Sequence, residues 1–382
     1  MGFIGTLAMI PGLDGLRAIA ILMVFASHSD LMEFGWTGVQ LFFVLSGFLI
    51  TGILLDMKES LPVRQYFGKF YGRRFLRIFP LYYFYLALMA VVAYGLIAVD
   101  FRPKYMHIFF NQVWYAVLYV YDLFYRMPWF QPSQFLDHFW SLAVEEQFYI
   151  VWPLLLLLVP QKHLKRLFVS FIALGVIFRI LLYLWYLSGS SSWIFREPFG
   201  LVAYSWPLSH LDAFALGAYI SRYTIWRPRL QLLVLTLLVP VVGFATNYFA
   251  TGSIGLVSAL GYDSSLSAGY QFIWAHTLLN YFFAVLIYCV IHEKFMVRFL
   301  EMPWLRYLGR ISYGMYVYHL ALIWFVWNLV DDVTKSDMTV WIKPAIALPV
   351  TILIATLSYY FLERPILSLK DRFFDWSKEK AE

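Results

Sequence analysis

Apolar runs long enough to cross a lipid bilayer recur along the whole 382-residue chain, and they restrict its fold more than any other feature. A transmembrane helix needs about 20 mainly apolar residues, and these runs are continuous, unlike the alternating pattern of β-barrel strands. We therefore predict an all-α, polytopic helical membrane protein with about ten transmembrane helices, at residues 9–29, 36–56, 75–99, 141–160, 165–187, 206–221, 230–250, 269–291, 311–330 and 339–362. The apolar stretch 105–121 is a candidate eleventh, re-entrant or interfacial segment.

The positive charges predict the orientation of these helices. If the N-terminus is cytoplasmic, 21 of the 29 Lys and Arg residues fall in cytoplasmic loops or the C-terminal tail, and only 5 fall in external loops. Cytoplasmic loops carry such an excess in membrane proteins, so both termini are predicted to be cytoplasmic. The net charge of +6 then follows from topology and requires no nucleic acid partner.

The chain reads as one domain embedded in a membrane and surrounded by membrane lipids. We expect a transmembrane domain over residues 1–365 and a short charged cytoplasmic tail over 366–382. The first apolar run has no small-residue cleavage site after it, so we interpret it as a retained helix. One cysteine, Cys289, excludes an intrachain disulfide and a cysteine metal cluster, and no metal site is predicted. The oligomeric state is not predicted.

The first span carries two ionisable residues that are costly in lipid, Arg17 and His28. Eleven residues of helix make three turns plus about 20°, so the two share a face and lie roughly 16 Å apart along the axis. With a cytoplasmic N-terminus, Arg17 lies in the inner half and His28 near the outer end. Each could simply reach a membrane interface, but two such residues on one stripe favour a functional site.

Polar residues in neighbouring segments fall at the same two depths. Arg74 and Arg77 share a helix face at the inner end of the third span, where they could anchor the helix or bind a phosphate-rich ligand. Glu145 and Glu146, and Asp212 after His210, lie in the outer halves of their spans. A carboxylate beside His28 would raise its basicity, as a general base requires, although a structural charge pair is the alternative. Ser46 and Gly47 interrupt the second span, where small residues also permit close helix packing.

The order of these motifs resembles the acyltransferase type 3 family of membrane proteins. The resemblance rests on six features in order, and it covers nearly the whole chain: Arg17 with His28, "FFVLSGFLIT", Arg74 with Arg77, "WSLAVEEQFYIVWPLL", "ISYGMYVYHL" and the "ERP" at residues 363–365. It implies transfer of an acyl group, commonly acetyl, from cytoplasmic acyl-CoA to hydroxyls of glycans, lipid-linked sugars or, in some members, macrolides. It also implies that His28 is the catalytic base and that Arg17, Arg74 and Arg77 bind the donor.

Two departures from the family pattern qualify the resemblance. Members often have Arg-x-Asp in the sixth span, where this chain has His210 and Asp212. Many relatives also carry an external hydrolase-like domain after the membrane domain, so a second transfer step is expected to need a separate protein.

A mechanism follows as a hypothesis. Coenzyme A binds at the inner mouth, its pantetheine arm runs up a channel between the spans, and His28, steadied by Glu145 or Glu146, deprotonates an external hydroxyl that attacks the thioester directly. Asp212 completes the predicted catalytic group. An acyl-enzyme relay is a variant of this mechanism.

One motif remains in the ninth span. Ser312, Tyr316 and His319 share a face, predicted in its inner half, and either line the donor channel or join packed helices. The rival class of function is a transporter or flippase of a glycan or lipid intermediate. A sensor or scaffold is disfavoured because no cytoplasmic module is evident.

Overall fold

The described part of the chain is built from helices and contains no β-strand. The computed structural model describes residues 10–189, 199–333 and 339–375. The α-helices are α1 (Leu13–His28), α2 (Thr37–Ser60), α3 (Val63–Ala98), α4 (Pro103–Val117), α5 (Tyr121–Phe124), α6 (Phe139–Leu158), α7 (Leu164–Leu187), α8 (Phe199–Ser205), α9 (Leu211–Arg222), α10 (Pro228–Thr251), α11 (Gln271–His292), α12 (Val297–Leu300), α13 (Pro303–Val333), α14 (Thr339–Ser358) and α15 (Arg364–Phe373). Short 3₁₀ segments are η1 (Glu33–Trp36), η2 (Gln161–His163), η3 (Pro207–His210), η4 (Val257–Ala259) and η5 (Ala268–Tyr270), and η6 (Tyr359–Glu363) is a π-helical turn.

Eight of the described helices are long and apolar enough to cross a membrane. The predicted fold class, an all-α polytopic membrane protein, is therefore confirmed. Two of the ten predicted spans, 9–29 and 206–221, correspond to α1 and α9, which have only 16 and 12 residues. At about 1.5 Å per residue, neither crosses a hydrocarbon core of about 30 Å alone. The segment predicted at 105–121 is the short helix α4, and α15 takes in residues 366–373 of the predicted tail.

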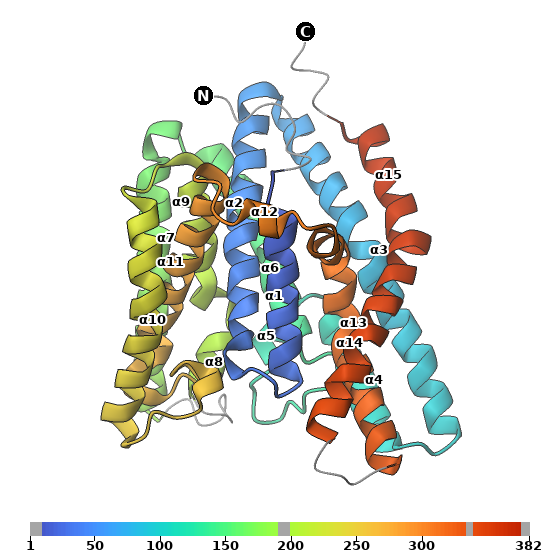
Figure 1. Ribbon diagram of the computed structural model, residues 1–382. Coiled ribbons are helices and arrows are strands. Elements are labelled where there is room, and N and C mark those ends of the chain that lie inside the picture. Colours follow the sequence, from blue (N-terminus) through green and yellow to red (C-terminus); the bar gives the residue numbers. More distant parts are fainter. Residues whose placement is uncertain (1–9, 190–198, 334–338, 376–382) are drawn as a thin grey trace.

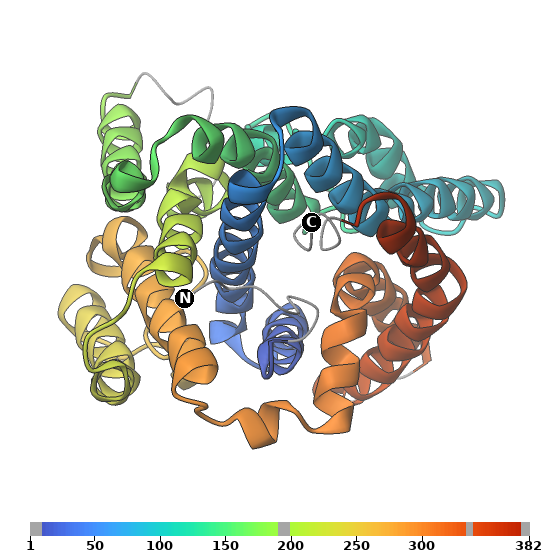
Figure 2. The same cartoon turned by 90° about the horizontal axis from the view of Figure 1, so that it is seen from above.

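Helix α1 is enclosed by other helices. Seen from above, it lies near the middle of the assembly, between α2 and the C-terminal helices (Figure 2). It packs along α2 and α13, and Ala18, Ile21 and Val24 in its centre are fully buried. A helix with so many apolar residues is thus shielded from lipid by protein on several sides, which suits a helix that carries a functional residue at its end.

Glycines set how closely the central helices approach. A β-carbon on Gly47 of α2 would lie 2.1 Å from the carbonyl oxygen of Phe214 in α9, and one on Gly217 would lie 2.1 Å from that of Val44. A β-carbon on Gly309 of α13 would lie 1.9 Å from the carbonyl oxygen of Asp14 in α1. The alternative interpretation of Gly47, a small residue for close helix packing, is therefore confirmed.

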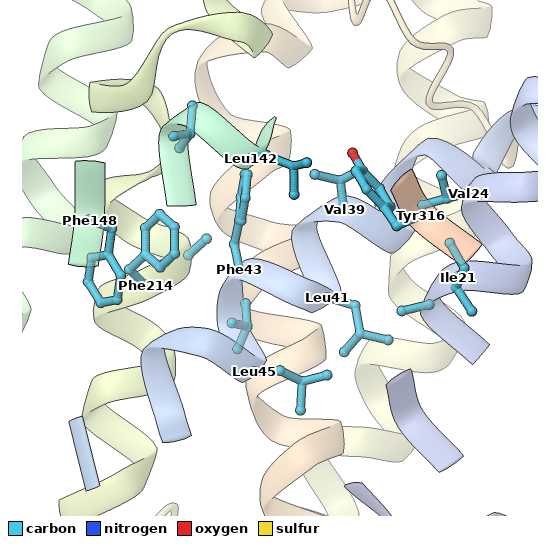
Figure 3. Close-up of a cluster of buried hydrophobic side chains, with 14 of the residues drawn as sticks. Ile21, Val24, Val39, Leu41, Phe43, Leu45, Leu142, Phe148, Phe214 and Tyr316 are labelled. Carbon is cyan, nitrogen blue, oxygen red and sulfur yellow. The ribbon is translucent and has the colours of Figure 1, made fainter. Parts of the chain in front are cut away.

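A continuous apolar core joins these helices. Figure 3 shows part of it, with Ile21 and Val24 of α1 in the same cluster as Phe43 of α2 and Phe214 of α9. The rings of Phe148 in α6 and Phe214 stack with centroids 4.0 Å apart. This packing fixes the relative positions of α1, α2, α6, α9 and α13, which carry most of the polar residues singled out in the sequence.

The described chain begins and ends on the same side of the bundle. The start of α1 and the end of α15 both face the top of Figure 1, and α2 and α3 are joined on that side as well. That both termini lie in the cytoplasm stays a prediction from the positive charges.

Candidate functional site

Three histidines from three helical segments meet at the end of α1. Nδ1 of His28, the last residue of α1, lies 2.9 Å from Nε2 of His319 in α13. The ring of His138, just before α6, has its centroid 4.9 Å from that of His319, and the His28 and His319 centroids are 5.0 Å apart. His319 is fully buried and His138 is 2% exposed, whereas His28 is only partly buried. His28 is therefore the accessible member of the cluster.

The hydrogen bonds fix which nitrogens carry protons when the rings are neutral. Nδ1 of His319 lies 2.6 Å from the carbonyl oxygen of Tyr316, which can only accept, so this nitrogen donates. Nε2 of His319 then has a lone pair and accepts from Nδ1–H of His28. As a result, Nε2 of His28 keeps its lone pair, which is the state that a general base needs.

His138 is tied to α13 and to the start of α6. Its Nε2 donates to the carbonyl oxygen of Val317 at 3.1 Å, and its own carbonyl oxygen accepts from Ser141 at 2.9 Å and from Tyr316 at 3.3 Å. The hydroxyls of Ser141 and Tyr316 also lie within hydrogen-bond distance of each other. Burial lowers the pKa of the His138 imidazole to about 3, so the ring is neutral. Sequence analysis missed His138, although a histidine directly before the fourth span lies at the same end of the bundle as His28.

The predicted depth of His319 is wrong. Helix α13 begins at Pro303 rather than near residue 311, so His319 lies about 24 Å along it. Because α1 and α13 run side by side, with Gly309 against Asp14, His319 reaches the level of His28. The two other residues of the motif have different contacts. Tyr316 joins the histidine cluster, whereas the Ser312 hydroxyl donates to the carbonyl oxygen of Gly309 within its own helix.

Neither predicted glutamate forms a hydrogen bond with His28, because the side chain of each lies against other residues. Glu145 is half-buried and accepts hydrogen bonds from Ser46 of α2 and Tyr149 of α6. Glu146 is 8% exposed, points away from Glu145 because consecutive helical residues differ by about 100°, and lies within electrostatic range of Arg74. The expected carboxylate partner of His28 is replaced by the imidazole of His319.

Asp212 forms its hydrogen bonds with residues outside the cluster of His28, His138 and His319. It forms an ion pair of 2.8 Å with Arg179 of α7, and both side chains are fully buried. Thr277 and Asn280 of α11 donate to its two carboxylate oxygens at 2.5 and 3.1 Å. The predicted meeting of Asp212 with His28 is therefore wrong, and the alternative, a buried charge pair that joins helices, holds.

The predicted donor-binding arginines converge from α1 and α3. Arg74 and Arg77 lie within electrostatic range of Arg17. Arg17 is paired with Asp14 at 2.6 Å, and its side chain remains 26% exposed. The guanidinium of Arg74 lies over the ring of Tyr149, 5.4 Å from its centroid, and so adjoins the hydrogen-bonded group around Glu145.

The side chains between the arginines and the histidines are of two kinds. On α1 itself, Ile21 and Val24 of the shared face are fully buried, so this stripe does not line an accessible path. On α2 and α6, Phe42, Ser46 and Glu145 are only half-buried. The ring of Phe42 contacts that of Tyr316, with centroids 6.2 Å apart. Two half-buried polar side chains between the two ends, Ser46 and Glu145, therefore lie on α2 and α6.

The histidines are not grouped as a metal centre. Both nitrogens of His319 and one nitrogen each of His28 and His138 are used in hydrogen bonds. In residues 10–189, 199–333 and 339–375, no group of three or more His, Cys, Asp or Glu is placed to hold a metal ion.

The protein is an integral membrane protein with a polar site inside its helix bundle. Arginines cluster near one end of α1 in this site, and paired imidazoles lie at the other end. Comparison with known proteins identifies the family. The sequence matches the family described as "Acyltransferase domain" over residues 10–362, nearly the whole chain, and the protein belongs to this acyltransferase type 3 family. The helices and this relationship place it in the plasma membrane as a multi-pass protein.

Two similar proteins have informative names. "Peptidoglycan O-acetyltransferase OatA" of Listeria monocytogenes is 29% identical over 97% of this chain and 57% of its own length. "Putative peptidoglycan O-acetyltransferase YrhL" of Bacillus subtilis is 29% identical over 96% of this chain and 56% of its own length. This chain thus spans little more than half the length of these relatives. No solved structure matches it.

Proposed function

We propose that this protein transfers an acetyl group from cytoplasmic acetyl-CoA to a hydroxyl of a cell-wall glycan or lipid-linked saccharide on the external side of the membrane. The hydrogen bond between His28 and His319 is the observation that carries the proposal, because it leaves a partly accessible imidazole nitrogen free to act as a base. The family match supports acyl transfer, and the names of the similar proteins support a glycan acceptor.

The proposed reaction is direct attack on the thioester. The acceptor hydroxyl gives its proton to Nε2 of His28 as its oxygen bonds to the thioester carbonyl carbon. The C–S bond then breaks, the ester is released, and the imidazolium returns the proton to the coenzyme A thiolate. His319 accepts from Nδ1–H of His28 throughout, and so stabilises the charged ring that forms between the two steps.

The donor is proposed to bind with its phosphates against Arg17, Arg74 and Arg77, because guanidinium groups match phosphate oxygens in charge and geometry. The pantetheine arm would follow the half-buried side chains of Ser46 and Glu145 toward His28. The distance of roughly 16 Å along α1 from Arg17 to His28 is comparable to the reach of that arm. Glu145 would then act on the donor side, by holding Ser46 and Tyr149 in place.

Arg74→Ala and Arg77→Ala are expected to weaken donor binding. Each variant loses a charge-assisted hydrogen bond to phosphate, which contributes about 1.5–3 kcal/mol, or a roughly 10- to 150-fold change in Kd. Binding of acetyl-CoA to the purified protein measures the effect. Arg64→Ala is the matched control, since Arg64 is an exposed arginine on the same helix. Unchanged affinity in both variants would show that the phosphate site lies elsewhere.

Acetyl transfer and transport of a glycan intermediate are separable in proteoliposomes. With acetyl-CoA on the arginine side and an oligosaccharide acceptor on the other, we expect release of free coenzyme A only when the acceptor is present, together with an acceptor mass increase of one acetyl group. A transporter would instead move the saccharide across the bilayer without consuming acetyl-CoA, and that result would refute the proposed function.

A further inference from the structure

His138 carries a buried hydrogen-bond acceptor that none of the described residues uses. Its Nε2–H is committed to the carbonyl oxygen of Val317, so the neutral ring has its lone pair on Nδ1. The residue is 2% exposed, and Nδ1 has no hydrogen-bond partner within the described ranges. Unpartnered polar atoms are rare in protein interiors because they lose hydration without compensation. Such an atom beside a reactive group points to a ligand.

The position of this acceptor is well defined. The His138 ring contacts the rings of His319 and Tyr316, with centroid distances of 4.9 and 5.4 Å. Its main chain is held by Ser141 and Tyr316, and its Nε2 by Val317. Only the His319 ring stands between His138 and His28 in this contact chain. The His138 ring, and with it the lone pair on Nδ1, is therefore held one ring away from the proposed base.

We propose that Nδ1 of His138 accepts a hydrogen bond from a second hydroxyl of the saccharide acceptor while His28 deprotonates the hydroxyl that reacts. Saccharides offer several hydroxyls within a few ångströms of one another, so one can bind while another attacks. His138 is then a positioning residue that orients the acceptor, not a second base. This inference rests on the proposed function and adds to it a binding site for the acceptor.

Two substitutions at this position separate the roles of the two ring nitrogens. His138→Asn places a side-chain oxygen near the position of Nδ1 and loses the bond to Val317, whereas His138→Gln retains a donor near the position of Nε2 and loses the acceptor. We expect His138→Gln to raise KM for the saccharide roughly tenfold, with kcat and the KM for acetyl-CoA little changed. His138→Asn should keep a KM for the saccharide within about threefold of the wild type.

A higher KM for the saccharide in His138→Asn than in His138→Gln would show that His138 serves only to join α6 to α13. This result would overturn the proposal. Equal saccharide KM values in both variants would overturn it as well. Acceptor analogues lacking one hydroxyl at a time give a second test on the unmodified protein: one deletion should raise KM roughly tenfold, and no such deletion would contradict the inference. Failure of the proposed function is distinguishable, because the unmodified protein would then transfer no acetyl group at all.

Discussion

His28→Ala is expected to lower the rate of acetyl transfer by about 10²- to 10⁴-fold while leaving acetyl-CoA binding intact. The variant removes the one imidazole of the cluster whose Nε2 is both accessible and free of a proton, so the attacking hydroxyl has no group to take its proton. Single-turnover formation of acetylated saccharide, with donor binding measured on the same preparation, tests this expectation.

Variants of two other histidines serve as references for this result. His107→Ala alters an exposed histidine on α4 and should transfer at the normal rate. His319→Ala removes the acceptor for Nδ1–H of His28 and should also slow the reaction, whereas His319→Gln retains a side-chain acceptor and should recover part of it. Near-normal transfer by His28→Ala would exclude His28 as the base.

Asp212→Ala is expected to reduce the free energy of unfolding by about 3–5 kcal/mol, since it leaves the fully buried guanidinium of Arg179 without its counter-charge. Thr277 and Asn280 would lose their acceptors in the same variant. Thermal or denaturant unfolding of the purified protein in detergent measures the change. The loss is expected in stability, not in donor affinity, because the side chain of Asp212 bonds to Arg179, Thr277 and Asn280 and not to the arginines of the donor site.

An exposed ion pair provides the control. Arg229 and Glu293 lie 2.8 Å apart, with the Arg229 side chain 72% exposed, and Glu293→Ala should cost no more than about 1 kcal/mol. The double variant Arg179→Met with Asp212→Asn removes both charges but keeps an acceptor for Asn280, and should regain much of the lost stability. Full stability in Asp212→Ala alone would show that the buried pair does not join α7 and α9.

The sequence alone determined the membrane class, the helical fold and which of the singled-out residues share a helix face. Apolar runs of spanning length leave a chain no alternative to helices in lipid, because each backbone polar group must be paired within its own segment. The shared face of Arg17 and His28, and that of Arg74 and Arg77, follow from helical geometry within one segment. Local periodicity is sufficient for predictions of this kind.

Tertiary structure decided which side chains meet. Whether His28 faces Glu145, Asp212 or His319 depends on the axial offset and rotation of α1 against α6, α9 and α13, and no local pattern contains these. Gly309 against Asp14 sets the offset of α1 against α13 by backbone contact, and Gly47 against Phe214 sets that of α2 against α9. As a result, His319 rather than a carboxylate partners His28, and Asp212 pairs with Arg179. The physical reason is that a helix fixes the positions of its own side chains, but only packing between helices fixes their partners.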